Sequence, residues 1–131
     1  MTNLGIASRH HLRLSENLED SLALFGSMAK TSPYDTSAVQ ISENQRKLMV
    51  QGNLLHKNQE YLAALDKYHE IIESDPLNCP FCYYSIAFIY ADIRNYNLAI
   101  FNMKKYLILY PDAPNARAAQ DKIYEWELLF H

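Results

Sequence analysis

The stretch that decides the fold spans residues 80–114 and reads PFCYYSIAFIYADIRNYNLAIFNMKKYLILYPDAP. Residues 45–79 follow the same plan, and in the two stretches Gly52 repeats as Ala87, Ala64 as Ala99 and Pro76 as Pro111. Self-similarity at a fixed period is the sequence signature of stacked helical units. The repeat therefore predicts an all-α fold in which successive helical hairpins pack against one another.

Each unit contains two apolar stripes at helical spacing, joined by a short polar turn. In the first unit the turn is Lys57-Asn58-Gln59-Glu60, and we expect Gly52 and Ala64 to let the two helices approach closely. In the second unit we expect helices over residues 81–91 and 96–110, with the turn between them. Each unit ends at a proline, which cannot continue a helix.

The ends of the chain carry weaker versions of the pattern. A stripe of Leu14, Leu18, Leu22 and Phe25 predicts an amphipathic helix within residues 1–35. This segment is either a degenerate unit or a cover for the surface of the other units. We expect one domain over 1–131, with units over 36–79 and 80–114 and a capping helix over 115–131.

These residues resemble the tetratricopeptide repeat family. The matching positions are Leu48, Gly52, Leu55, Ala64, Tyr68 and Pro76 in one unit, and Tyr83, Ala87, Tyr90, Ala99, Met103 and Pro111 in the next. The resemblance implies an α-solenoid of antiparallel helix pairs with two clear units, one degenerate N-terminal unit and a C-terminal capping helix. It also implies a concave groove, lined by the first helix of each pair, that holds a segment of a partner protein.

The resemblance supplies the candidate partner-binding residues. Transferring the family's groove positions to this sequence gives Met49, Asn53, His56, Lys57, Tyr84, Ser85, Phe88 and Asp92, with Ala91 at a further groove position. The helix over 81–91 is apolar almost all round, so its remaining aromatic side chains need a cover. That cover is either a partner peptide or the N-terminal segment of the chain itself.

We therefore expect an adaptor that binds another protein, as a monomer or a weak homodimer. The alternatives left open are a dedicated chaperone of a secreted protein and a self-associating scaffold that uses the apolar residues 128–131. Trp126 is expected either to line the end of the groove or to seal the core. We expect no enzyme activity, because no catalytic set stands on a recognisable framework.

Composition excludes several other classes. The formal net charge of −3 argues against a nucleic-acid partner, and no apolar run is long enough to span a membrane. We expect no cofactor and no metal, because the motif His69-Glu70-Ile71-Ile72-Glu73 lacks the second histidine of a zinc-protease site. With only two cysteines, a reducing cytoplasm is the expected location.

Cys79 and Cys82 form a C-x-x-C motif. Two thiols at this spacing can share a disulfide or supply half of a zinc site. A redox role would need a thioredoxin-like strand and helix, and a zinc site would need two further ligands, neither of which the sequence shows. We therefore expect two free cysteines that behave as small buried apolar residues.

Overall fold

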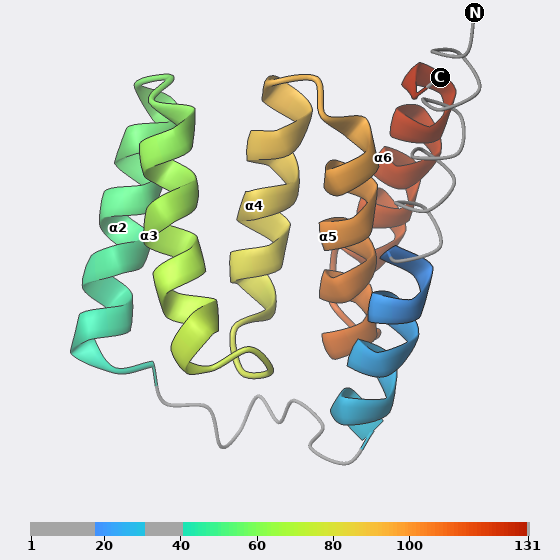
Figure 1. Cartoon of the computed structure of the whole chain (residues 1–131), viewed down its shortest axis with the longest axis horizontal. Coiled ribbons are helices and arrows are strands. Elements are labelled where there is room, and N and C mark those ends of the chain that lie inside the picture. Colours follow the sequence, from blue (N-terminus) through green and yellow to red (C-terminus); the bar gives the residue numbers. More distant parts are fainter. Residues whose placement is uncertain (1–17, 31–40, 131) are drawn as a thin grey trace, which may run out of the picture.

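The computed structural model describes residues 18–30 and 41–130. The helices in it are α2 (Glu43–Lys57), α3 (Tyr61–Ser74), α4 (Pro80–Asp92), α5 (Tyr96–Leu109) and α6 (Ala116–Leu129), with residues 18–30 forming an N-terminal helix (Figure 1). Every regular element in the described part of the chain is helical, which confirms the all-α class.

The helices pack in pairs that follow one another in a row, α2 with α3 and α4 with α5, and α6 then packs against α5 (Figure 1). The turns inside the two pairs share one backbone feature: Gln59 has φ 64° and Arg94 has φ 65°. These residues are 35 positions apart in the sequence and both adopt the left-handed conformation that favours glycine. The two hairpins are thus built in the same way down to the backbone of the turn.

Local signals explain where the helices begin. The Ser42 side chain accepts from the backbone N–H of Gln45, and the Gln45 side chain accepts from the backbone N–H of Ser42. This reciprocal capping box starts α2 at Glu43. Pro80 occupies the first turn of α4, where a missing N–H is tolerated.

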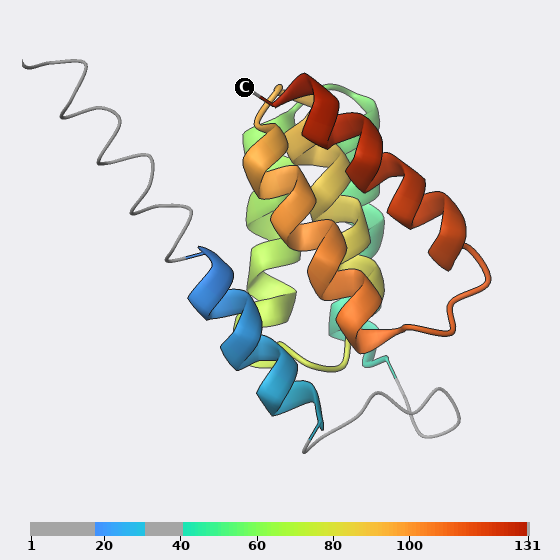
Figure 2. The same cartoon turned by 90° about the vertical axis from the view of Figure 1, so that its right-hand side faces the viewer.

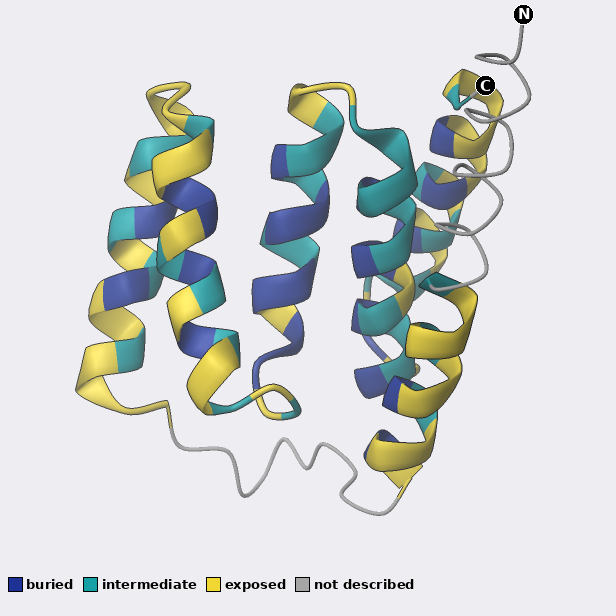
Figure 3. Ribbon diagram, in the orientation of Figure 1, coloured by how far each residue is buried: buried dark blue, intermediate teal, exposed yellow. Residues whose placement is uncertain are grey.

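The core divides into two clusters of buried side chains (Figure 3). One lies between α2, α3 and the facing side of α4, and the other is formed by α4, α5, α6 and the N-terminal helix. Gly52 serves the first cluster: a Cβ atom there would lie 2.7 Å from the ring of Tyr68. The close approach expected at Gly52 is therefore present, and the side chain that occupies the space beside it is Tyr68, while Ala64 is fully buried in the same cluster.

The N-terminal helix lies beside α5, on the side away from α6 (Figure 2). Its residues Leu18 and Leu22 flank the same small hollow as Ile100 and Phe101 of α5. Over the described residues, the leucine stripe therefore covers α5. The parts of the expected N-terminal unit at residues 1–17 and 31–35 lie outside the described residues.

Phe25 anchors this helix to the core. Its ring meets the ring of Tyr83 edge-on, with centroids 5.4 Å apart. The Nζ atom of Lys105 lies 5.1 Å from the Phe25 ring centroid, 5.2 Å from that of Tyr83 and 4.4 Å from that of Phe101. Burial lowers the pKa of Lys105, while the three ring faces provide a favourable environment for its positive charge.

The expectation of two free cysteines is wrong. Cys79 and Cys82 form a disulfide, with their Cα atoms 5.3 Å apart. Cys79 is the N-cap of α4 and Cys82 lies in the first turn, so the start of the helix brings the two side chains within bonding reach. Disulfides persist mainly in oxidising compartments, so the bridge removes the argument that led from the small number of cysteines to a cytoplasmic location.

Candidate protein-binding groove

Aromatic side chains of α4 form a row on the side that faces α5 and α6. The ring of Tyr84 lies 4.9 Å from that of Phe88 and 5.0 Å from that of Tyr106, measured between centroids. Phe88 in turn meets the indole of Trp126 on α6 edge-on at 5.5 Å. The capping helix α6 covers part of this row, and Trp126 both closes the core and contacts it. On another side of α4, Phe25 of the N-terminal helix covers Tyr83.

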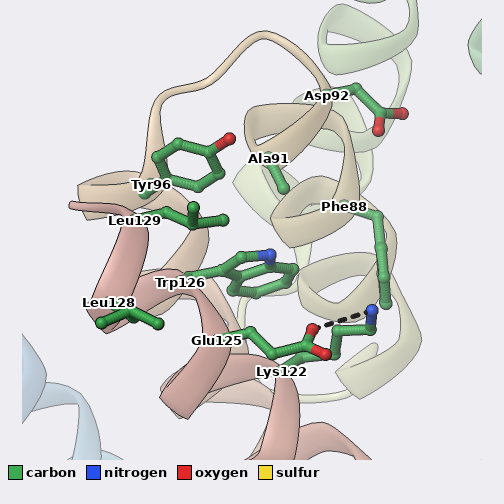
Figure 4. Close-up of a pocket in the computed structure, with 9 residues that line it drawn as sticks. All are labelled: Phe88, Ala91, Asp92, Tyr96, Lys122, Glu125, Trp126, Leu128 and Leu129. Carbon is green, nitrogen blue, oxygen red and sulfur yellow. Dashed lines mark ion pairs between the residues drawn. The ribbon is translucent and has the colours of Figure 1, made fainter.

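An open hollow of about 600 Å³ lies beside this contact (Figure 4). It is lined by Phe88, Ala91 and Asp92 of α4, Tyr96 of α5, and Lys122, Glu125, Trp126, Leu128 and Leu129 of α6. Figure 4 shows the Trp126 indole near the centre, with Phe88 on one side and Leu129 on the other. The floor is apolar and aromatic, which is the usual composition of a site that takes an apolar group.

Two charged pairs lie at the rim of the hollow. Lys122 Nζ is 3.0 Å from a Glu125 carboxylate oxygen on the same helix (Figure 4). Asp92 is paired with His56 of α2, whose Nε2 lies 2.6 Å from Oδ2 of the carboxylate. This second pair joins residues from the two hairpins and fixes one carboxylate oxygen at the edge of the site.

Asn53 and Ser85 are tied to the buried residue Tyr68. The Tyr68 hydroxyl donates a hydrogen bond to Oδ1 of Asn53, and the Ser85 side chain bonds to the same hydroxyl. Burial raises the pKa of Tyr68, and the bond from Ser85 offsets part of this increase. Because these bonds hold Asn53 and Ser85 to the first hairpin's core, a partner would meet them only through their remaining polar atoms.

The predicted groove residues thus fall into three groups. Phe88 and Asp92 line the hollow, and Tyr84 and His56 contact them directly. Asn53 and Ser85 hold Tyr68, and Met49 packs against the core between α2 and α4. Lys57 ends α2 as an exposed residue.

Sequence reasoning missed most of the α6 side of the hollow. Lys122, Glu125 and Leu129 lie outside the two repeated units, and the sequence places Tyr96 at the start of a helix but not in the groove. The available signal was the spacing of Trp126 and Leu129, which are three residues apart and so lie on neighbouring positions of one helical face.

Among the described residues, no group of three or more His, Cys, Asp or Glu side chains gathers in a way that could hold a metal ion. Over residues 18–30 and 41–130, no helix is both long and apolar enough to cross a bilayer.

In comparisons with known proteins, no family model matches this chain, and no curated protein or solved structure matches it significantly. The resemblance to tetratricopeptide repeats therefore stays a resemblance, carried by the repeated positions and by the two equivalent hairpins.

Proposed function

We propose that this chain is a protein-interaction module that holds an apolar segment of a partner protein in the hollow between α4 and α6. The observation that carries the proposal is the open hollow of about 600 Å³ on an aromatic floor made by Phe88 and Trp126. Buried aromatic contacts dominate the energetics of many protein interfaces. The proposed role is binding alone, without catalysis.

The rim supports a defined direction for the bound segment. Asp92 and Glu125 offer carboxylate oxygens on opposite helices, and Lys122 lies beside Glu125. A partner whose apolar side chain enters the hollow would meet these polar groups at the edge, where they can fix orientation. An apolar centre with a polar rim is the usual arrangement of a protein interface.

A displayed library of random peptides provides the probe for this proposal. Peptides selected on the wild-type chain should carry an apolar anchor residue. Their affinity should fall about ten-fold or more in Phe88→Ala, because this substitution removes part of the floor. The same loss is expected in Leu129→Glu, which places a carboxylate in the hollow.

The matched control is Leu62→Glu. Leu62 is an exposed leucine of α3 that does not line the hollow, so the same change in chemistry should leave peptide affinity unchanged. Selected peptides that bind Phe88→Ala and Leu129→Glu as tightly as the wild type would show that the site lies elsewhere.

A further inference from the structure

The two ends of the row of helices carry exposed faces that match each other. The α2 outer face consists of Glu43, Lys47, Val50 and Leu54, which follow one another at spacings of four, three and four residues. All four are exposed, and 55% of the Val50 surface and 58% of the Leu54 surface are open to solvent. Residues at these spacings lie along one side of a helix, over about 16 Å of its length.

The α6 outer face has the same spacing at the opposite end of the row. It consists of Arg117, Asp121, Tyr124 and Leu128. These residues are also exposed, and 60% of the Tyr124 surface and 74% of the Leu128 surface are open to solvent. Each face therefore presents two charged residues followed by two large apolar residues.

The internal repeat shows what the α2 outer face is suited to do. The residues of α4 that lie 35 positions after Lys47 and Leu54 are Cys82 and Ile89. Both are fully buried in the cluster that α4 shares with α3. Ser85, which corresponds to Val50, is half-buried, and Asn78, which corresponds to Glu43, is exposed and precedes α4. The part of α4 that corresponds to residues 47–54 is thus a helix-packing surface, whereas α2 has no described helix before it in the row (Figure 1).

We propose that copies of this chain associate head to tail, with the α6 outer face of one copy lying along the α2 outer face of the next. The register that carries the proposal is Arg117 against Glu43, Asp121 against Lys47, Tyr124 against Val50 and Leu128 against Leu54. Both charged positions then meet an opposite charge, and both apolar positions meet an apolar side chain. In the single chain Glu43 already bonds Arg46, so Arg117 would join that pair.

The direction of the helices suits this arrangement. In Figure 1 α2 and α6 stand at opposite ends of the row, and both run from the lower edge of the molecule to the upper edge. Figure 2 shows α6 inclined to α3, the hairpin partner of α2, so the next copy must turn as well as shift along the row to lay its α2 parallel to α6, which is the orientation that the register requires. A contact between two different faces can extend to further copies, so the assembly grows with concentration.

The expected contact is weak. Two helices of about four turns bury less surface than a standard interface of about 1,600 Å². Sedimentation equilibrium should therefore be measured at protein concentrations up to roughly several hundred micromolar, because weakly bound pairs form only in that range. The average mass of the wild-type chain should rise steadily with concentration.

Two single substitutions separate the faces. Val50→Glu and Tyr124→Glu each place a carboxylate in the apolar half of one face, at a position that is already exposed. Each variant alone should stay monomeric where the wild type associates. An equimolar mixture should form a one-to-one dimer that grows no further, because each variant keeps one intact face. Leu62→Glu, on neither face, should associate like the wild type.

A charge exchange tests the register. Asp121→Lys should weaken association about ten-fold, since it opposes Lys47 of the next copy. Adding Lys47→Glu to the same chain should restore association. A wild type that stays monomeric throughout, a Tyr124→Glu chain that still forms dimers, or a mixture that fails to pair would each overturn the proposal.

The α6 outer face and the hollow share Leu128, so the test uses substitutions outside the hollow to tell the two proposals apart. Val50 and Tyr124 do not line the hollow, so both variants should keep the affinity of the wild type for the selected peptides. Loss of self-association with intact peptide binding, or the reverse, shows which of the two proposals has failed.

Discussion

Replacing Gly52 with alanine should destabilise the protein, although the same change in an exposed helix is normally favourable. Alanine is about 1 kcal/mol better than glycine inside a helix. Here the added Cβ would lie 2.7 and 2.9 Å from two atoms of the Tyr68 ring, closer than side-chain carbons approach in folded proteins. The ring is fully buried and its hydroxyl is held by Asn53, so it cannot move away without breaking other contacts.

Overpacking of a core by one methyl group typically costs about 1–3 kcal/mol. An approach below 3.0 Å places the cost in the upper half of this range, about 2–3 kcal/mol. Subtracting the helix preference of about 1 kcal/mol, we expect Gly52→Ala to lower the free energy of unfolding by about 1–2 kcal/mol. Urea unfolding followed by circular dichroism measures the change, and the slope m should stay constant.

Gly26 provides a matched control for this substitution. It also lies in a helix, but a Cβ atom there would meet nothing within 4 Å. Gly26→Ala should therefore raise stability by up to about 1 kcal/mol. In a double-mutant cycle, Tyr68→Leu should reduce the effect of Gly52→Ala, because it removes the ring that the methyl group meets. A Gly52→Ala chain as stable as the wild type would refute this packing of α2 on α3.

Three further predictions concern the turn, the disulfide and alkaline pH. Arg94 has a left-handed φ of 65°, which is unfavourable for a residue with a side chain, so Arg94→Gly should raise the free energy of unfolding by about 0.5–1 kcal/mol. Urea unfolding measures the change, and a lower free energy of unfolding in the variant would contradict the claim of backbone strain at Arg94. The Cys79–Cys82 bridge closes a short loop with a separation of 3 residues, so replacing both cysteines by alanine should lower the free energy of unfolding by about 2 kcal/mol. A reducing agent should lower the free energy of unfolding of the wild type by the same amount and leave that of the variant unchanged. Burial, with a smaller contribution from the Asp75 carboxylate, raises the pKa of Tyr83 from 10.0 to about 12. The stabilising contribution of Tyr83 is thus complete below pH 10 and is lost as pH rises towards 12, and Tyr83→Phe should flatten this decline in unfolding free energies.

Much of the fold follows from local pattern. The two hairpins, the turn after Lys57 and the start of α4 at Pro80 were all readable from the sequence, because apolar periodicity and proline act within a few residues. The cap at Ser42 is also a local signal, since both of its hydrogen bonds join residues three apart. The sequence alone did not select it, because Ser37-Ala38-Val39-Gln40 fits the same capping pattern.

The site was less predictable because it depends on contacts between distant residues. The pairing of His56 with Asp92 joins residues 36 positions apart, and only the relative placement of α2 and α4 brings them together. The contact between Trp126 of α6 and Phe88 likewise depends on the angle at which α6 packs against the preceding helices. No residue pattern in the sequence specifies that angle. The sequence allows a disulfide between Cys79 and Cys82, but the absence of a thioredoxin-like strand and helix around the motif favoured free cysteines. The start of a helix is itself enough to bring the two side chains together.

The most direct test of the proposed groove uses Trp126, the single tryptophan of the chain, which lies in the hollow itself. The indole is almost fully buried, so a selected peptide without tryptophan should change its emission through contact with the neighbouring lining residues, and the change should be saturable. The dissociation constant from this titration should equal that from calorimetry. Saturable binding in the calorimeter with unchanged Trp126 emission would contradict the account.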